Sequence, residues 1–154
     1  MLFANYIVKR KTMRKSETIG ELAKAQAKMQ SELQDIGKDS KGYGYNYTSL
    51  DSLVAYLRPL LAKHGLSFVQ APIAEDGKIG VETIWMHESG EWLEQTMVTD
   101  RAELKGMNLY QSVGSAITYY RRYMISAFAG IASDEDTDGT AKTGTKQTNN
   151  KGGW

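Results

Sequence analysis

The sequence contains no cysteine, and histidine is almost as scarce. Without thiols the chain forms neither a disulfide framework nor a thiolate zinc site, which suits a reducing compartment. His64 and His87 are the only histidines, and no helical or strand spacing brings either of them a partner. A zinc site or a catalytic triad built on histidine therefore has no support in the sequence.

Long apolar runs are also missing. No stretch reaches the roughly 18 apolar residues that a membrane-spanning helix requires, and the first residues lack the charge order and cleavage site of a signal peptide. The phosphate-binding motif G-x-x-x-x-G-K-[ST] does not occur, so the sequence shows no P-loop site for ATP-driven strand exchange. We therefore expect a cytoplasmic protein that has no membrane partner and needs no nucleotide cofactor.

A strong excess of either charge is absent as well, because 19 basic residues face 18 acidic ones. The distribution is nevertheless uneven. Residues 1–15 hold five basic residues and no acid, and the middle of the chain is mildly acidic. Any contact with a polyanion must therefore be a local patch. The length predicts one domain, which we place at residues 16–133, between a basic arm at 1–15 and a polar, disordered tail at 134–154.

Hydrophobic periodicity predicts a first helix over residues 18–37. Thr18 and Glu21 have the spacing of a capping box, and Gly37 provides an end. Gln26 interrupts the apolar stripe of this helix, which favours a helix that lies on a surface or against a partner.

A second helix is predicted over residues 50–64, with Thr48 or Ser49 as its cap and Gly65 as its stop. Pro59 lies well inside this segment and predicts a kink or a break, because proline removes a hydrogen-bond donor and clashes with the preceding turn.

Three strand-like runs follow, at residues 66–74, 78–87 and 91–100, and the second alternates between two faces. The turn sequences Asp76-Gly77 and Ser89-Gly90 separate them, which predicts a three-stranded antiparallel meander. A long final helix then begins near Asn108, with Gln111 at the matching third position of a capping box.

The final helix contains the sequence "QSVGSAITYYRRYMIS", residues 111–126, in which two adjacent arginines, Arg121 and Arg122, lie among three tyrosines, Tyr119, Tyr120 and Tyr123. Guanidinium groups form bidentate contacts with phosphate, and aromatic faces stack on unpaired bases. The pattern therefore fits a contact with a polyanion. It also fits a packed helix in which Tyr120 is core and the arginines pair with acidic residues.

Glycines alternate with tyrosines between the first two helices, at Gly42, Tyr43, Gly44, Tyr45 and Tyr47, just after Lys38 and Lys41. Glycine permits close approach of another backbone, and the lysines supply positive charge. The same composition also fits a loop whose tyrosines cover the sheet.

The acidic sequence "DEDTDG" begins like an EF-hand loop, but its twelfth position is Thr145 where a bidentate glutamate belongs. Three interpretations of Asp134, Asp136 and Asp138 stay open. They form a weak Mg²⁺ or Ca²⁺ site, they belong to a solvated acidic tail, or they occupy the protein's own basic groove until DNA displaces them.

Four blocks in order carry a family resemblance: "KGYGYNYTSLDSLVAYLRPLLAKHGLSF", "HESGEW", "QSVGSAITYYRRYMISAFAGI" and "DEDTDG". Together they resemble the ERF (essential recombination function) family of single-strand annealing proteins, found mainly in bacteriophages and prophages. The resemblance covers about residues 16–139. It implies an α+β fold in which a three-stranded meander packs against a long C-terminal helix, with helices at the N-terminal side, similar to that of the ring-forming annealers.

The resemblance also implies a function. Members of this family are ATP-independent recombinases that bind single-stranded DNA, assemble into rings or filaments, and anneal complementary strands. The implied partners are single-stranded DNA, further copies of the chain, and a host single-strand DNA-binding protein. The alternatives are a non-annealing oligomeric scaffold or recombination accessory, and a metal-dependent nuclease built on the acidic stretch.

On the matched motifs we predict two groups of site residues. The DNA-binding group comprises Arg121, Arg122, Lys38, Lys41 and Arg101 for phosphate, with Tyr43, Tyr45 and Tyr119 for base stacking. The oligomerisation or packing group comprises Gly114, Gln111 and Tyr123. No catalytic residue and no metal ligand is assigned, and we expect the protein not to be an enzyme.

Overall fold

A computed structural model describes residues 13–41, 46–101 and 105–134. The helices are α1 (Gly20–Ser31), α2 (Leu50–Lys63) and α3 (Leu109–Ala129). The strands are β1 (Arg14–Lys15), β2 (Ser40–Lys41), β3 (Asn46–Tyr47), β4 (Leu66–Glu75), β5 (Lys78–His87) and β6 (Trp92–Asp100). The predicted α+β class is confirmed. Within this part of the chain, no helix combines the length and apolar character that crossing a bilayer requires.

The main sheet has the antiparallel order β1-β6-β5-β4, so the predicted three-stranded meander is confirmed and extended by one strand. Asp76 and Gly77 form the tight β4–β5 turn with φ of 50° and 70°, the left-handed conformations that such hairpin turns require. The added strand, β1, consists of Arg14 and Lys15, which the sequence assigns to the basic arm. Two residues are too few for a periodic pattern to predict.

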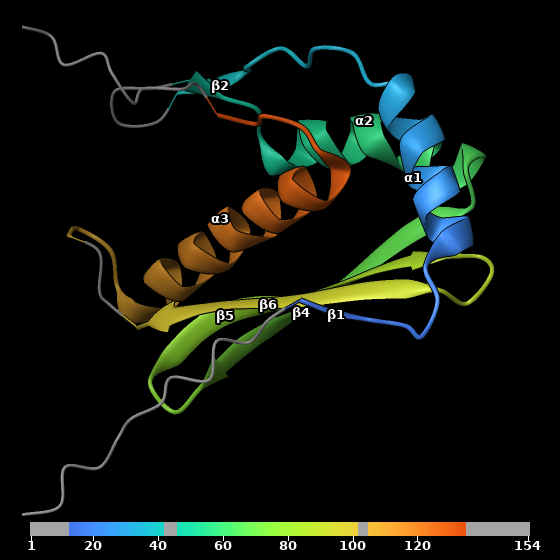
Figure 1. The fold of residues 1–154 in the computed structure, drawn as a ribbon. Helices are drawn as coiled ribbons and strands as arrows, with labels where there is room; N and C mark the ends of the chain where they lie inside the picture. The colour runs from blue at the N-terminus through green and yellow to red at the C-terminus, as the bar shows by residue number, and fades with distance from the viewer. Residues whose placement is uncertain (1–12, 42–45, 102–104, 135–154) are drawn as a thin grey trace, which may run out of the picture.

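The three helices lie on the same side of the sheet, with α3 along it and α1 towards one end (Figure 1). The core forms where they meet β5. Trp85 is fully buried, and its ring stacks between Phe68, at 5.9 Å, and Phe128, at 5.7 Å. Alternate residues of β5 face this core, as the sequence pattern predicts, because successive side chains of a strand point to opposite faces.

The first helix differs from the prediction at both ends. It ends at Ser31 rather than at Gly37, and Ile19 occupies the N-cap position without a capping side chain. The predicted Thr18–Glu21 capping box is therefore wrong. Glu91, from the β5–β6 turn, caps the helix by accepting hydrogen bonds from the Leu22 N–H (2.7 Å) and the Thr18 hydroxyl (2.9 Å). These bonds, the backbone one first, lower the pKa of the Glu91 carboxyl.

Gln26 lies inside the fold, where its amide serves the core. Its oxygen accepts a hydrogen bond from the Trp85 indole N–H (2.9 Å), and its nitrogen donates to the Phe128 carbonyl (2.7 Å). The interpretation of this residue as a sign of an external surface or partner is therefore wrong. The polar residue within this apolar stripe accepts the hydrogen bond of a buried tryptophan N–H.

The second helix matches its prediction except at Pro59. Ser49 caps it, accepting a hydrogen bond from the Ser52 N–H (3.2 Å), and it ends at Lys63, just before Gly65. Pro59 does not split it, because α2 continues through this residue. Both Pro59 and Ala55, whose carbonyl loses its helical donor, are exposed, so water can satisfy that carbonyl.

The capping box of the final helix is confirmed in both directions, between Asn108 and Gln111. At the other end Gly130 adopts a left-handed φ of 79° and closes the helix with an N–H bond to the Ser126 carbonyl. The buried residues of this helix include the polar Ser112 and Ser126 and the charged Arg122.

Candidate nucleic-acid interface

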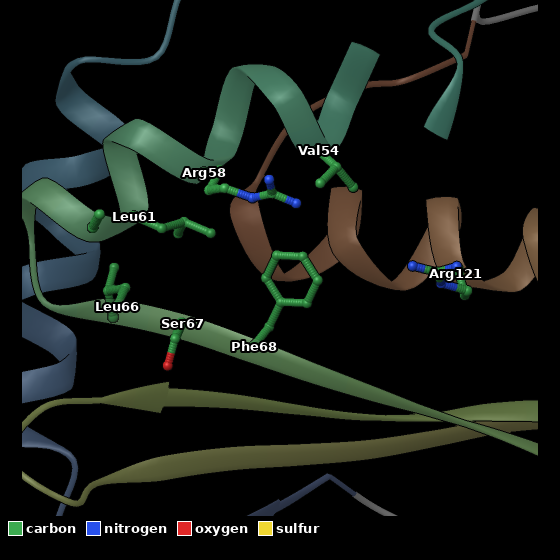
Figure 2. A pocket seen from close by; sticks show the side chains of 8 residues that line it. Val54, Arg58, Leu61, Leu66, Ser67, Phe68 and Arg121 are labelled. Atoms are coloured by element: carbon green, nitrogen blue, oxygen red, sulfur yellow. The ribbon is translucent and has the colours of Figure 1, made fainter. Parts of the chain in front are cut away.

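A groove lies between α2, β4 and α3 and encloses about 390 Å³. Leu61, Leu66 and Phe68 give it apolar walls, and Arg58 and Arg121 supply the charged groups of its lining. Figure 2 shows Arg58 reaching from α2 above the Phe68 ring, which rises from β4, with Arg121 further along on α3. Both charges are positive, so the groove favours an anionic ligand.

A second hollow of about 360 Å³ adjoins this groove and shares Val54, Arg58 and Arg121 with it. Asp51 also lines this second hollow and is the one acidic residue of that lining. Because the shared residues connect the two hollows, we treat them as a single channel and call it the Arg58–Arg121 groove.

Arg121 is positioned by Gln70 of β4. The Arg121 Nε–H donates to the Gln70 side-chain oxygen (3.2 Å), and the Gln70 amide nitrogen donates to the Arg121 carbonyl (3.1 Å) and the Thr83 hydroxyl (3.0 Å). Within the described residues neither Arg121 nor Arg58 forms a salt bridge. One oriented guanidinium and a second beside it, both without a salt bridge in this part of the chain, are well suited to phosphate oxygens.

The neighbouring Arg122 has the opposite environment, because the fold buries it to 5% exposure. Its guanidinium lies 4.0 Å from the Tyr47 ring centre and 5.5 Å from that of Tyr119. Its Nη2 forms an ion pair with Asp134 at 3.2 Å. The alternative in which this arginine pairs with an acidic residue therefore describes its state in the structure, and its contact with phosphate stays a prediction.

The tyrosines of α3 form a partly exposed cluster over this buried arginine. The Tyr119 and Tyr123 rings lie 4.4 Å apart, and Tyr119 meets Tyr120 edge to face at 5.7 Å. A hydrogen bond with Tyr119, then burial and the nearby Asp134 charge, raise the pKa of the Tyr123 hydroxyl well above its usual range. Tyr119, at 40% exposure, keeps ring surface open for stacking.

The other predicted cations are not part of this groove. Lys38 is exposed just before β2, and Lys41 is exposed at the end of that strand. Arg101 lies beyond the end of β6, beside a smaller hollow formed with the first half of α3. Their contact with DNA stays a prediction.

Gln111 and Gly114 have different local roles. Gln111 completes the capping box of α3, which accounts for this residue without a partner chain. Outside the helix's own backbone, no atom of the described residues lies within 4 Å of a Cβ built at Gly114, so no contact between helix and strand in this part of the chain requires glycine there. Roles of Gln111, Gly114 and Tyr123 in subunit packing stay predictions.

Several predicted site residues lie outside the described residues: Tyr43 and Tyr45 of the glycine–tyrosine segment, and Asp136 and Asp138 of the acidic stretch. Where the chain is described, no three histidine, aspartate or glutamate side chains gather as a metal site. Asp134 is the member of the acidic stretch that the structure describes, and its carboxylate pairs with Arg122 and interacts with the Tyr123 hydroxyl.

Sequence reasoning missed Arg58. It is a single arginine in the apolar second helix, next to Pro59, and nothing local distinguishes it from a solvated side chain. Its importance comes from the packing of α2 beside α3, which brings it to the same groove as Arg121. A periodic pattern predicts the face of a helix but not its distant neighbour.

Comparison with known proteins agrees with the motif resemblance. The model of one family, the ERF superfamily, matches residues 22–153, which include the groove, the buried arginine and the tyrosine cluster. No curated protein and no solved structure matches the chain. The chain therefore belongs to the ERF superfamily, a family of recombination proteins that act in single-strand annealing.

Proposed function

We propose that this protein is an ATP-independent recombinase that binds single-stranded DNA without reading its sequence and anneals complementary strands. The Arg58–Arg121 groove is the observation that supports this proposal. Its two guanidinium groups, without a salt bridge in the described part of the chain, lie beside an apolar and aromatic wall. Such a groove grips the backbone of an unpaired strand, while apolar surface accommodates bases of any kind.

The proposed mechanism holds phosphates and leaves base edges exposed. Contacts with the backbone supply affinity but carry no sequence information. A second strand is then tested by base pairing, and the stacking and pairing of matched bases drive the reaction. In this mechanism no bond is broken, so neither a catalytic residue nor a nucleotide or metal cofactor takes part.

Self-assembly completes the proposal. A groove in one chain spans only a few nucleotides, and the net charge of +1 gives each chain little general attraction for DNA. Copies assembled into a ring or filament would align their grooves, and binding at many weak sites in series raises the overall affinity. In the cytoplasm of a host cell, such an assembly would act beside a host single-strand DNA-binding protein.

The test is a double variant, Arg58→Ala with Arg121→Ala. We expect at least tenfold weaker binding of a fluorescent oligothymidine, measured by anisotropy. The slope of log affinity against log salt should fall by about 1.4, because each phosphate contact on a single strand contributes about 0.7. Lys24→Ala with Lys28→Ala is the matched control, because it removes the same charge from exposed positions on α1. Annealing of two complementary strands without ATP should fall in parallel.

Two outcomes contradict parts of the proposal. A groove variant that keeps its oligomeric state and binds with unchanged affinity and salt slope excludes the groove as the binding site. A wild-type protein that assembles but neither binds nor anneals DNA excludes the function and favours the non-annealing scaffold.

A further inference from the structure

We propose that Arg122 is a second phosphate-binding site, which Asp134 occupies in the absence of DNA and which a backbone phosphate of the DNA takes over. This inference rests on the proposed function for its natural ligand. The site itself is defined by contacts that do not depend on that function: Arg122, the rings of Tyr47 and Tyr119, and the segment Ser133–Asp134.

The guanidinium of Arg122 is held in place by aromatic rings. It stands over the Tyr47 ring at 4.0 Å and near the Tyr119 ring at 5.5 Å, and its side chain is 6% exposed. Stacking on a ring fixes the plane of the guanidinium, and burial strengthens any ionic contact made in that plane. The arginine is therefore preorganised for an anion.

Asp134 uses this preorganised group incompletely. Its Oδ1 accepts one hydrogen bond, from the Arg122 Nη2, at 3.2 Å. The buried Arg122 Nε has no hydrogen-bond partner among the described residues. A guanidinium offers Nε and Nη as a fork to two oxygens of one anion, and a buried donor left without a partner is costly. A phosphate bound to both Nε and Nη2 would give the Nε–H the hydrogen-bond acceptor that the Asp134 carboxylate does not provide.

The segment that covers Arg122 is attached by few contacts. After α3 ends, the Ser133 carbonyl accepts a hydrogen bond from the Thr48 N–H (2.8 Å), and Asp134 forms an isolated bridge with Tyr47. The Asp134 carboxylate also interacts with the Tyr123 hydroxyl. No strand or helix extends this attachment within the described residues. Release of Ser133 and Asp134 would expose both the guanidinium and the Tyr47 ring, which is a phosphate site beside a surface for base stacking.

Arg122 also follows Arg121 directly on α3, so the covered site continues the open one around the helix. DNA bound at Arg121 carries negative charge towards Asp134, and the carboxylate in turn weakens DNA binding. Two anions that compete for one cation affect each other's binding equally. The segment Ser133–Asp134 thus competes with DNA for Arg122 and raises the DNA concentration at which the site is occupied.

The first test compares Asp134→Asn with the control Glu75→Gln, which removes one negative charge at the β4–β5 hairpin. We expect Asp134→Asn to bind oligothymidine at least about fivefold more tightly than the control, within the range typical of coupling between sites. Its salt slope should steepen by about 0.7, because one further phosphate is bound. An affinity and slope equal to those of the control would overturn the proposal.

The second test needs no substitution. Hydrogen exchange of the Thr48 amide in the wild-type chain reports the bond to Ser133, and saturating oligothymidine should speed it. Unchanged protection in the DNA complex means that the segment stays in place and overturns the displacement.

The third test separates this inference from the proposed function. Inorganic phosphate is titrated into Asp134→Asn while the Arg122 Nε–H resonance is followed. A saturable shift supports the site even if the wild-type chain binds no DNA, an outcome that would overturn the proposed function alone. No shift with phosphate, together with no gain in DNA affinity, leaves Arg122 as a structural ion pair.

Discussion

At the scale of single residues, the environment of a side chain decides its role more than its type does. Arg121 and Arg122 are adjacent on α3, yet Arg121 lines an open groove and Arg122 is buried against Asp134. Successive residues on a helix point in directions about 100° apart, so neighbours in sequence regularly face different surroundings. Conclusions about one arginine therefore do not extend to the other.

A prediction at this scale concerns Asp39. Its carboxylate accepts hydrogen bonds from the Ser52 hydroxyl and from the Ser49 N–H (2.8 Å) and hydroxyl (3.0 Å), and these lower its pKa to about 2. A lowered pKa means that the folded state favours the charged form, so its stabilisation is complete above 3.8 and is lost as the pH falls towards 2.

Substitution of Asp39 by asparagine should therefore remove part of the acid sensitivity. The free energy of unfolding, measured by urea denaturation, should fall less steeply between pH 3.8 and 2 in Asp39→Asn than in the wild type. The control is Asp35→Asn, which changes another exposed aspartate four residues before Asp39. The same acid dependence in wild type and Asp39→Asn would show that the hydrogen bonds of the Asp39 carboxylate contribute no pH-dependent stability.

At the scale of elements, glycines at different positions meet different constraints. A Cβ at Gly80 of β5 would lie 2.8 Å from the Val98 Cα and closer still to the Met97 carbonyl oxygen. Strand β6 would have to shift to admit it. A Cβ at Gly114 of α3 would meet no described atom within 4 Å beyond the backbone of its own helix.

These two glycines form a matched pair of alanine substitutions. Gly80→Ala should lower the free energy of unfolding by about 1–3 kcal/mol, because the added methyl overpacks a strand pair. Gly114→Ala should raise it by about 0.5–1 kcal/mol, because alanine favours the helix and open space receives the methyl. Chemical denaturation measures both. A destabilised Gly114→Ala chain would point instead to a contact between copies, which loss of the oligomer would then reveal.

At the scale of the whole molecule, the sheet positions the helices that line the groove, and the helices carry its two arginines. Gln70 of strand β4 hydrogen-bonds with Arg121, and α2 and α3, which both line the groove, lie on the same side of the sheet (Figure 1). The net charge of +1 means that no general field draws DNA to the chain. Local cations must therefore be repeated over several copies to hold a strand firmly.

This argument predicts that assembly and DNA binding are coupled. Sedimentation velocity should show larger complexes as the oligothymidine is lengthened, and the affinity per chain should rise with length until a full assembly is occupied. A chain that remains monomeric at every concentration, with and without DNA, would contradict the coupling. The Arg58→Ala, Arg121→Ala variant should assemble normally without DNA, since both residues line the groove.

The sequence by itself determined the features that depend on neighbours along the chain. The capping box at Asn108, the Asp76-Gly77 hairpin turn, the Ser49 cap and the alternation of β5 all follow from contacts within a few residues. The family motifs belong to this group too, because they are local blocks in a fixed order.

Only the tertiary structure decided the features that join distant segments. Glu91 replaces the local cap of α1, Gln26 turns inward to Trp85, and Arg58 meets the groove of Arg121. Asp134 reaches back to cover Arg122. Glu91, Gln26 and Asp134 are polar groups whose partners come from other elements, and Arg58 enters the groove because α2 packs beside α3. A periodic pattern predicts that such a group is near the core, but the packing of elements selects the partner.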